Sequence, residues 1–241
     1  MSPLEFALLL AFSLLGAVVQ CTTGFGFAVV LMSVIPHFMG SYLECAALCS
    51  MGGLFISLMV TIKNLKNANF KVMIPLIIGY AVSCGIAVPM SKHIPTASLA
   101  KALGAVLVAA SIYFLFFNNK FRIRPTFANG IIAGSIAGVG AALFAVAGPP
   151  IAIFLISTTE DKDIYRATSL AFFTMSSFYS TTMRVINGII TVKLITVFLP
   201  MLAMIVLGYF VGNKVFAKIN IDIIKRMVYI LMAISGLAML L

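Results

Sequence analysis

The chain has 241 residues, of which 62% are hydrophobic and only 9% are charged, and its formal net charge is +10. A soluble domain needs about a quarter of its residues charged to cover its surface, so this composition excludes a soluble globular protein. The basic residues lie in short gaps between apolar runs and form no patch interleaved with aromatic residues, so we expect no nucleic-acid partner.

Apolar runs of about 18 residues or longer recur along the chain without alternating at period two, which predicts an all-α polytopic membrane protein. No basic residue precedes the first run, so we expect a membrane helix there and not a signal peptide. In the first half, residues 1–118, we expect a broken pair of helices over 4–39 and membrane spans over 42–62, 70–90 and 98–117. In the second half, residues 119–241, we expect a broken pair over 127–157 and spans over 165–187, 192–212 and 221–241.

The second half repeats the plan of the first. The stretches Gly16 to Phe27 and Gly138 to Pro150 each place one glycine ten positions before another, and an apolar run follows in both. The two stretches are offset by 122 residues, which is close to half of the chain. A duplicated Gly/Pro break inside apolar sequence indicates the binding site of a transporter.

Residues 151–157, which follow Pro150, are too few to cross a bilayer core of about 30 Å at ~1.5 Å per residue. Each broken pair is therefore interpreted as a re-entrant hairpin that enters and leaves on the same side. With both pairs re-entrant, twelve basic residues gather on one side and four on the other, whereas a single crossing of the second pair would leave eight against eight. The first arrangement agrees with the excess of basic residues on the cytoplasmic side of membrane proteins.

This arrangement predicts two inverted repeats, each made of a re-entrant hairpin and three full spans. Both termini are then expected on the outer side of a bacterial inner membrane. The residues expected on the cytoplasmic side are Lys63, Lys66, Lys71, Lys120, Arg122, Arg124, Lys162, Arg166, Lys214, Lys218, Lys225 and Arg226, and those expected outside are Lys92, Lys101, Arg184 and Lys193.

A new helix is expected to begin after each break, with roughly +0.5 charge and free N–H donors at its start. Two such starts that meet near the membrane midplane would bind a small anion, and glycines would let the ligand approach the backbone. The candidate substrate-binding residues are Gln20, Thr22, Thr23, Gly24, Phe25, Gly26, Gly148, Pro149 and Pro150. For a second group of glycines the favoured interpretation is close helix packing; these are Gly16, Gly130, Gly134 and Gly138.

The two glycine hairpins, the Gly148-Pro149-Pro150 element, the length and the two-fold repeat resemble the TauE/SafE sulfite exporter family over the whole chain. The first hairpin departs from the family pattern, because Phe25 and Phe27 flank Gly26 where small residues are common. The resemblance implies export or uptake of sulfite, sulfonates or related sulfur-containing organic anions. The leading hypothesis is thus a secondary transporter of a small anion that works by alternating access. The alternatives are a carboxylate permease and a membrane subunit of a larger energised complex; the chain itself has no Walker loop.

If transport is proton-coupled, Glu44 is the best carboxylate for that role; the alternative is that it anchors its helix at the membrane interface. Its counterpart in the second repeat is Arg166. Arg184 follows the hydroxyl-rich run 174–182 and is expected in an outer vestibule, where it would attract anions or lie at the interface. With Arg166 it completes the candidates for coupling or gating. The hydroxyl-rich run itself is open to two interpretations, helix packing and the lining of a wet path.

No catalytic, metal or cofactor site is expected, because no nucleophile–base pair or metal-ligand cluster can be found. The four cysteines are interpreted as small buried apolar residues; they are Cys21, Cys45, Cys49 and Cys84. The expected partners are the anion, the lipid bilayer and a coupling proton or sodium ion, with a homodimer as a further option.

Overall fold

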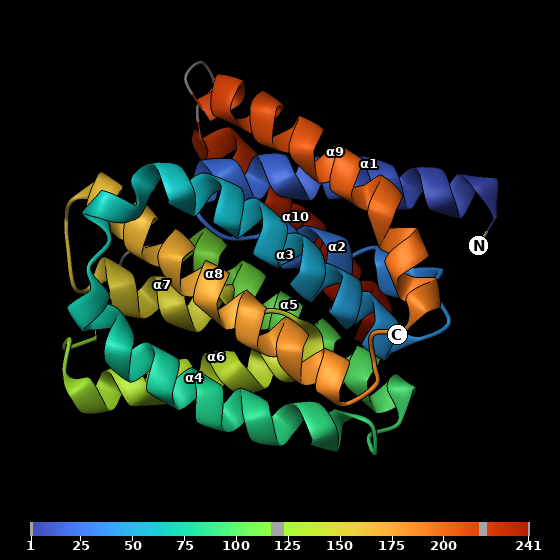
Figure 1. The fold of residues 1–241 in the computed structure, drawn as a ribbon, viewed down its shortest axis with the longest axis horizontal. Coiled ribbons are helices and arrows are strands. Elements are labelled where there is room, and N and C mark those ends of the chain that lie inside the picture. Colours follow the sequence, from blue (N-terminus) through green and yellow to red (C-terminus); the bar gives the residue numbers. More distant parts are fainter. Residues whose placement is uncertain (1, 117–122, 217–220, 241) are drawn as a thin grey trace.

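The computed structural model describes residues 2–116, 123–216 and 221–240, and every regular element in these ranges is helical. This confirms the all-α class (Figure 1). The expected boundary between the halves, at residues 118 and 119, lies outside the described residues. The helices are α1 (Pro3–Thr23), α2 (Phe27–Met32), η1 (Ile35–His37), α3 (Tyr42–Asn64), η2 (Leu65–Asn67), α4 (Phe70–Ser91), α5 (Thr96–Phe116), α6 (Phe127–Phe144), α7 (Gly148–Ile156), α8 (Lys162–Ile186), α9 (Val192–Phe216) and α10 (Ile221–Leu240).

Six helices are long and apolar enough to cross a membrane, by length and composition, among the described residues: α1, α3, α4, α5, α6 and α9. The expected set of full spans differs from this one in two ways. It left out α1 and α6, which are the long arms of the broken pairs. It included 165–187, which falls in α8, where charged residues such as Arg166 and Arg184 lower the hydropathy, and 221–241, of which only part has described side chains.

Helix packing follows a two-fold pattern. The first residues of α4 and α9, Phe70 and Val192, are 122 positions apart, so at this offset α4 corresponds to α9 and α1 to α6. The two most extensive helix–helix contacts are α4 with α6 and α1 with α9. Because α4 corresponds to α9 and α6 to α1, these two contacts are equivalent. In the pairs α3 with α8 and α5 with α10, a helix of the first half packs against the helix that corresponds to it in the second half.

Glycines allow α4 and α6 to approach very closely. A Cβ at Gly134 would lie 2.1 Å from the carbonyl oxygen of Leu76, and one at Gly79 would lie 2.2 Å from that of Ile131. The equivalent contact of α1 with α9 uses Gly208, where a Cβ would lie 2.7 Å from the carbonyl oxygen of Leu14. Small residues that permit backbone contact are typical of helix interfaces in lipid, where burial of apolar surface provides no drive.

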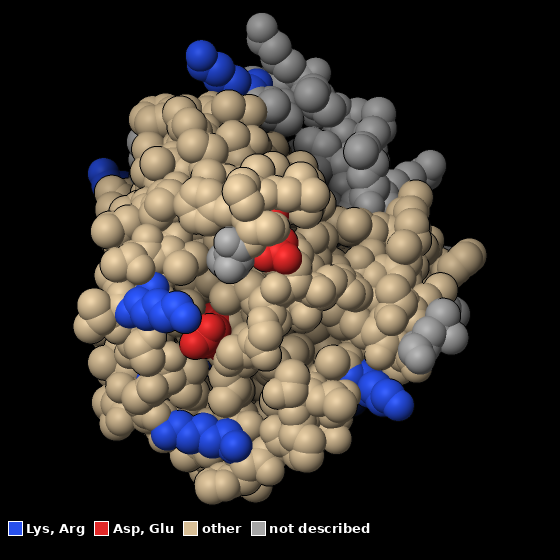
Figure 2. All heavy atoms as spheres, turned by 90° about the vertical axis from the view of Figure 1, so that its right-hand side faces the viewer, with Lys and Arg blue, Asp and Glu red and all other residues tan. Residues whose placement is uncertain are grey.

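The long helices run roughly along the horizontal axis of Figure 1, and the start of α1 and the end of α10 lie toward the same end of the molecule. The short helices α2 and α7 pack against α1 and α6, the long arms that precede them, and each is too short to cross a membrane. Figure 2 looks onto the end that carries the termini and shows scattered charged groups on a largely uncharged surface.

We predict that Gly134→Ala lowers the free energy of unfolding by about 1–3 kcal/mol, because its methyl group would force α4 and α6 apart. An alanine inside a helix otherwise stabilises it by about 0.5–1 kcal/mol relative to glycine, so the sign of the change identifies the clash. Gly40→Ala is the control, since a Cβ at Gly40 meets nothing within 4 Å. Thermal unfolding in detergent measures both; an equal or higher Tm for Gly134→Ala would contradict the packing.

Candidate functional site

The first break lies between α1 and α2 and depends on two glycines. Gly24 has φ = 85° and Gly26 has φ = 115°, a left-handed conformation that side chains disfavour. Gln20, in the last turns of α1, bridges the break: its Oε1 accepts a hydrogen bond from the Phe27 N–H at 2.9 Å. Its Nε2 donates to Ser57 Oγ of α3 at 2.8 Å. Gln20 therefore fixes the start of α2 relative to both α1 and α3.

Thr22 and Thr23 satisfy the backbone at the break. The Thr22 hydroxyl donates to the carbonyls of Val18 and Val19, at 3.0 and 2.9 Å. The Thr23 hydroxyl lies within hydrogen-bond distance of the carbonyls of Val19 and Phe25. Both were expected to offer donors to a ligand, but their hydroxyls bind backbone carbonyls in the last turns of α1 and at the break.

The second break lies between α6 and α7 and is built differently. Ala145, with φ = 55°, ends α6, and its N–H donates to the Ala141 carbonyl at 2.9 Å. Helix α7 begins at Gly148, and Pro149 and Pro150 occupy its first turn. The prolines suit this place because no intrahelical N–H bond is required there. They shape the helix start, and neither lines the pocket described below.

The two breaks lie in contact. A Cβ at Gly148 would be only 2.7 Å from Cδ2 of Phe25, so the phenyl ring of the first break covers the start of α7. Phe27 is fully buried, and its ring lies against Gly52 of α3, where a Cβ would be 2.4 Å away. The aromatic residues that distinguish the first hairpin thus fill the space that Gly52 and Gly148 leave open.

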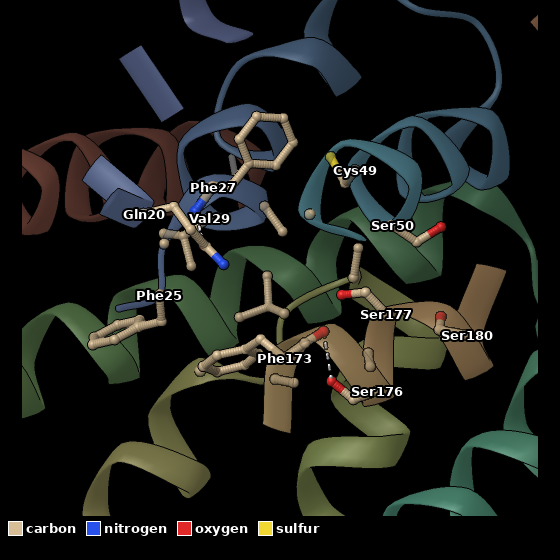
Figure 3. A pocket seen from close by; sticks show the side chains of 18 of the residues that line it. Gln20, Phe25, Phe27, Val29, Cys49, Ser50, Phe173, Ser176, Ser177 and Ser180 are labelled. Atoms are coloured by element: carbon tan, nitrogen blue, oxygen red, sulfur yellow. Dashed lines mark hydrogen bonds between the residues drawn. The ribbon is translucent and has the colours of Figure 1, made fainter. Parts of the chain in front are cut away.

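Between the breaks lies a pocket of about 50 Å³, which we call the central pocket (Figure 3). Since about 10–15 Å³ on this measure holds one water molecule, it has room for roughly three to five waters or a small oxyanion group. The first break contributes Gln20, Phe25, Gly26, Phe27, Ala28 and Val29, and the second contributes Ala141, Ala145, Val146, Ala147 and Gly148. The crossing helices contribute Cys49, Ser50, Gly53, Tyr80, Phe173, Ser176, Ser177 and Ser180.

Hydroxyl groups provide much of the polar lining, and no Lys, Arg, Asp or Glu of the described residues lines the pocket. In Figure 3 the Ser177 hydroxyl points toward the residues of the first break, whereas the Ser176 hydroxyl donates to the Phe173 carbonyl at 3.3 Å. These serines belong to the run 174–182, whose hydroxyl content was the sequence signal for a wet path. Another member of the run, Thr174, instead donates to the Leu170 carbonyl and pairs with Thr61, so the run also packs helices.

Sequence reasoning did not identify several lining residues, among them Ser50, Gly53, Tyr80 and Phe173. Ser50, Gly53 and Tyr80 lie within apolar helices where their neighbours in sequence give no sign of a site, and Phe173 is an apolar residue that directly precedes the hydroxyl-rich run. Of the expected residues, Gln20, Phe25, Gly26 and Gly148 line the pocket, whereas Thr22, Thr23, Gly24, Pro149 and Pro150 lie outside its lining.

Two arginines of α8 bind the ends of the two long arms. Arg166 donates from Nη2 to the Cys21 carbonyl of α1 at 2.7 Å. Arg184 donates from Nη2 to the carbonyls of Ala141 and Ala142 in α6, at 3.0 and 2.9 Å. A cation at the C-terminus of a helix is favourable, because the last carbonyls carry roughly −0.5 charge there.

Arg184 also donates from Nη1 to Ser180 Oγ at 2.6 Å, and it is only 1% exposed. It therefore lies inside the protein and not in the outer vestibule that we expected. Glu44 is half-buried in the first turn of α3, where Ser41 caps the helix, and it does not line the central pocket. Neither Glu44 nor Arg166 is brought to the pocket, so a coupling role for either stays a hypothesis.

A larger apolar groove of about 650 Å³ lies beside the central pocket and shares Tyr80 and Ser176 with it. Its other lining residues are almost all apolar, with Phe55, Met175 and Phe178 partly exposed. Such a surface suits lipid chains and offers almost no donors to an anion. The chemistry of the lining therefore favours the smaller pocket as the candidate site.

No group of three or more potential metal ligands occurs among the described residues, and the four cysteines are buried and free. A sequence model described as sulfite exporter TauE/SafE matches residues 8–239, nearly the whole chain. No curated protein and no solved structure matches it. The match covers both broken hairpins and all the helices that line the central pocket. The chain therefore belongs to the sulfite exporter TauE/SafE family.

Proposed function

We propose that this multi-pass membrane protein is a secondary transporter of a small anion, of the sulfite or sulfonate class, and that the anion binds in the central pocket. The observation that carries the proposal is that two backbone breaks, 122 residues apart in sequence, meet at one small pocket. Irregular backbone at membrane depth is tolerated only where it is buried in protein or lines a wet cavity. The sulfur chemistry of the substrate rests on the family.

The lining favours an anion over a cation. It contains hydroxyls and backbone amides but no carboxylate among the described residues. At the start of α7, Pro149 and Pro150 have no N–H, and Gly148 is the residue of α7 that lines the pocket, so Gly148 supplies the amide there. The Phe27 N–H of the short helix α2 is already paired with Gln20, so α2 lines the pocket with Phe27, Ala28 and Val29 but does not offer its first amide. This asymmetry refines the expectation of two equal helix starts.

Alternating access would use the two-fold packing of the halves. Contacts of α4 with α6 and of α1 with α9 are equivalent, and the central pocket lies where the hairpins meet α3 and α8. Movement of one hairpin and its neighbours relative to the other would open the pocket to one side at a time. The phenyl ring of Phe25 over Gly148 lies at the contact that such a movement must change.

We predict that the protein reconstituted in liposomes transports at least one anion from a panel of sulfite, thiosulfate, sulfoacetate, taurine and carboxylates. In the same assay Gly53→Met should lower the transport rate by at least about tenfold, because its side chain fills a pocket that holds only a few waters. Gly53→Ala is the matched control, since its Cβ would lie 3.4 Å from Ser177 Oγ and fits with little adjustment.

Thermal unfolding of the same variants separates a blocked pocket from a misfolded protein. Transport by Gly53→Met at the wild-type rate would remove the central pocket from the pathway. Transport of a cation while every anion fails would overturn the proposed function. Transport of carboxylates alone would retain the pocket and replace the sulfur anion.

We further propose that both termini lie on the outer side of the membrane. The start of α1 and the end of α10 lie toward one end of the molecule, and twelve of the 16 Lys and Arg residues belong to the opposite end in the inverted arrangement. A reporter enzyme that is active only outside the cytoplasm, fused after the last residue, should be active. Activity confined to a cytoplasmic reporter at that position would reverse the orientation.

A further inference from the structure

Arg184 is a buried cation for which the described part of the chain provides no carboxylate. Among the described residues it is the largest fully buried side chain, and it donates hydrogen bonds to Ser180 Oγ and to two carbonyls of α6. The other groups that face it are Cys84, Tyr80, Cys49 and Tyr42. Thiols and phenols are neutral near pH 7, so they do not balance a positive charge.

The helix end offsets only part of this charge. The last carbonyls of α6 supply roughly half a negative charge, while the start of α7 adds roughly half a positive charge on the other side of the break. The surroundings of the central pocket therefore hold close to one net positive charge. A buried charge is costly unless a partner balances it. The central pocket lies beside the buried charge of Arg184.

Ser180 links Arg184 to the pocket. It lines the pocket, and its Oγ accepts a hydrogen bond from Arg184 Nη1 at 2.6 Å. A hydroxyl has one proton to donate, and Arg184 can only donate. Arg184 therefore uses an acceptor site of the Ser180 oxygen, and the Ser180 proton goes either to Tyr80 or Cys84, which lie within hydrogen-bond reach, or to a group in the pocket that accepts. An anion is such a group, because a deprotonated oxyanion offers only acceptors.

Arg166 also binds the end of a long arm, but its surroundings differ from those of Arg184. It binds one carbonyl at the end of α1, but it is only partly buried and Asp163 lies close enough to interact with its charge. Water and a carboxylate can thus balance Arg166. Arg184 has neither, so capping of α6 does not by itself account for a full charge in this place.

We propose that Arg184 sets the charge of the substrate, so that the central pocket selects an anionic group with one negative charge, such as hydrogen sulfite or a sulfonate, over a divalent oxyanion. This inference rests on the proposed function and adds the charge of the substrate to it. Arg184 is a positioning residue: it orients the Ser180 hydroxyl, and its charge provides the positive electrostatic potential in the central pocket. A single negative charge balances the site, whereas a dianion would leave an unbalanced negative charge in a small pocket inside the protein.

The test compares methanesulfonate with sulfate, two tetrahedral sulfur oxyanions that differ in charge, as competitors of transport in liposomes. The wild type should be inhibited by methanesulfonate at a concentration at least about tenfold below that needed for sulfate. Arg184→Gln should lose this preference, and Arg184→Lys, which retains the charge, should restore it. Lys101→Gln, which removes an exposed charge, should leave the ratio unchanged.

Restoration by lysine separates charge from capping, because Arg184→Lys loses much of the hydrogen bonding to α6 and should still unfold at a lower temperature. If Arg184→Gln does not fold, the wild-type ratio and Ser180→Ala decide. Ser180→Ala keeps the cation and should weaken inhibition by methanesulfonate while preserving the preference over sulfate.

Three results would overturn this inference: a wild type that prefers sulfate or does not discriminate, an Arg184→Gln variant that keeps the wild-type ratio, and a Ser180→Ala variant that binds methanesulfonate as well as the wild type. A wild type that transports no anion at all would instead remove the proposed function. The two failures are therefore distinguishable in one set of liposomes.

Discussion

The pairing of backbone groups at two helix breaks is the constraint on which the rest of this structure depends. In an apolar environment each unpaired N–H or C=O is costly, so a helix can stop at membrane depth only if other groups take its hydrogen bonds. Here Gln20 pairs the start of α2, while Arg166 and Arg184 pair the ends of α1 and α6. With the carbonyl ends paired by cations, Gly148 at the start of α7 and Ser177 and Ser180 of α8 lie at the pocket, while Ser176 donates to the Phe173 carbonyl.

The breaks meet because the long arms are held by equivalent contacts. Gly134 of α6 and Gly208 of α9 both allow backbone contact, and this places the two hairpins on either side of α3 and α8. The halves share their plan but not their chemistry. The first break depends on glycines and a glutamine, and the second depends on prolines. The arginines that bind the two helix ends, Arg166 and Arg184, both come from α8. The two-fold architecture thus surrounds a site that is itself asymmetric.

Much of the fold could be predicted from the sequence, because its signals are local. The glycines of the first break, the Gly148-Pro149-Pro150 helix start and the small residues of α6 each reflect backbone geometry or close packing at one position. The site was less predictable. Arg184 was noticed, but its partners in α6 lie more than 40 positions away, so its burial and its link to Ser180 could not be inferred. Thr22 and Thr23 had the right chemistry for a ligand, and the helix end uses it instead.

The central claim is that the two breaks enclose one anion site, and a structure determined with a bound heavy-atom anion tests it most directly. Selenite is a suitable probe, because selenium replaces the sulfur of sulfite and scatters anomalously. The account predicts one anomalous peak in the central pocket, near Gly148 and placed so that an oxygen of the anion lies within hydrogen-bond distance of Ser180. A peak elsewhere in the protein, with the pocket empty at a concentration that saturates transport, would contradict it.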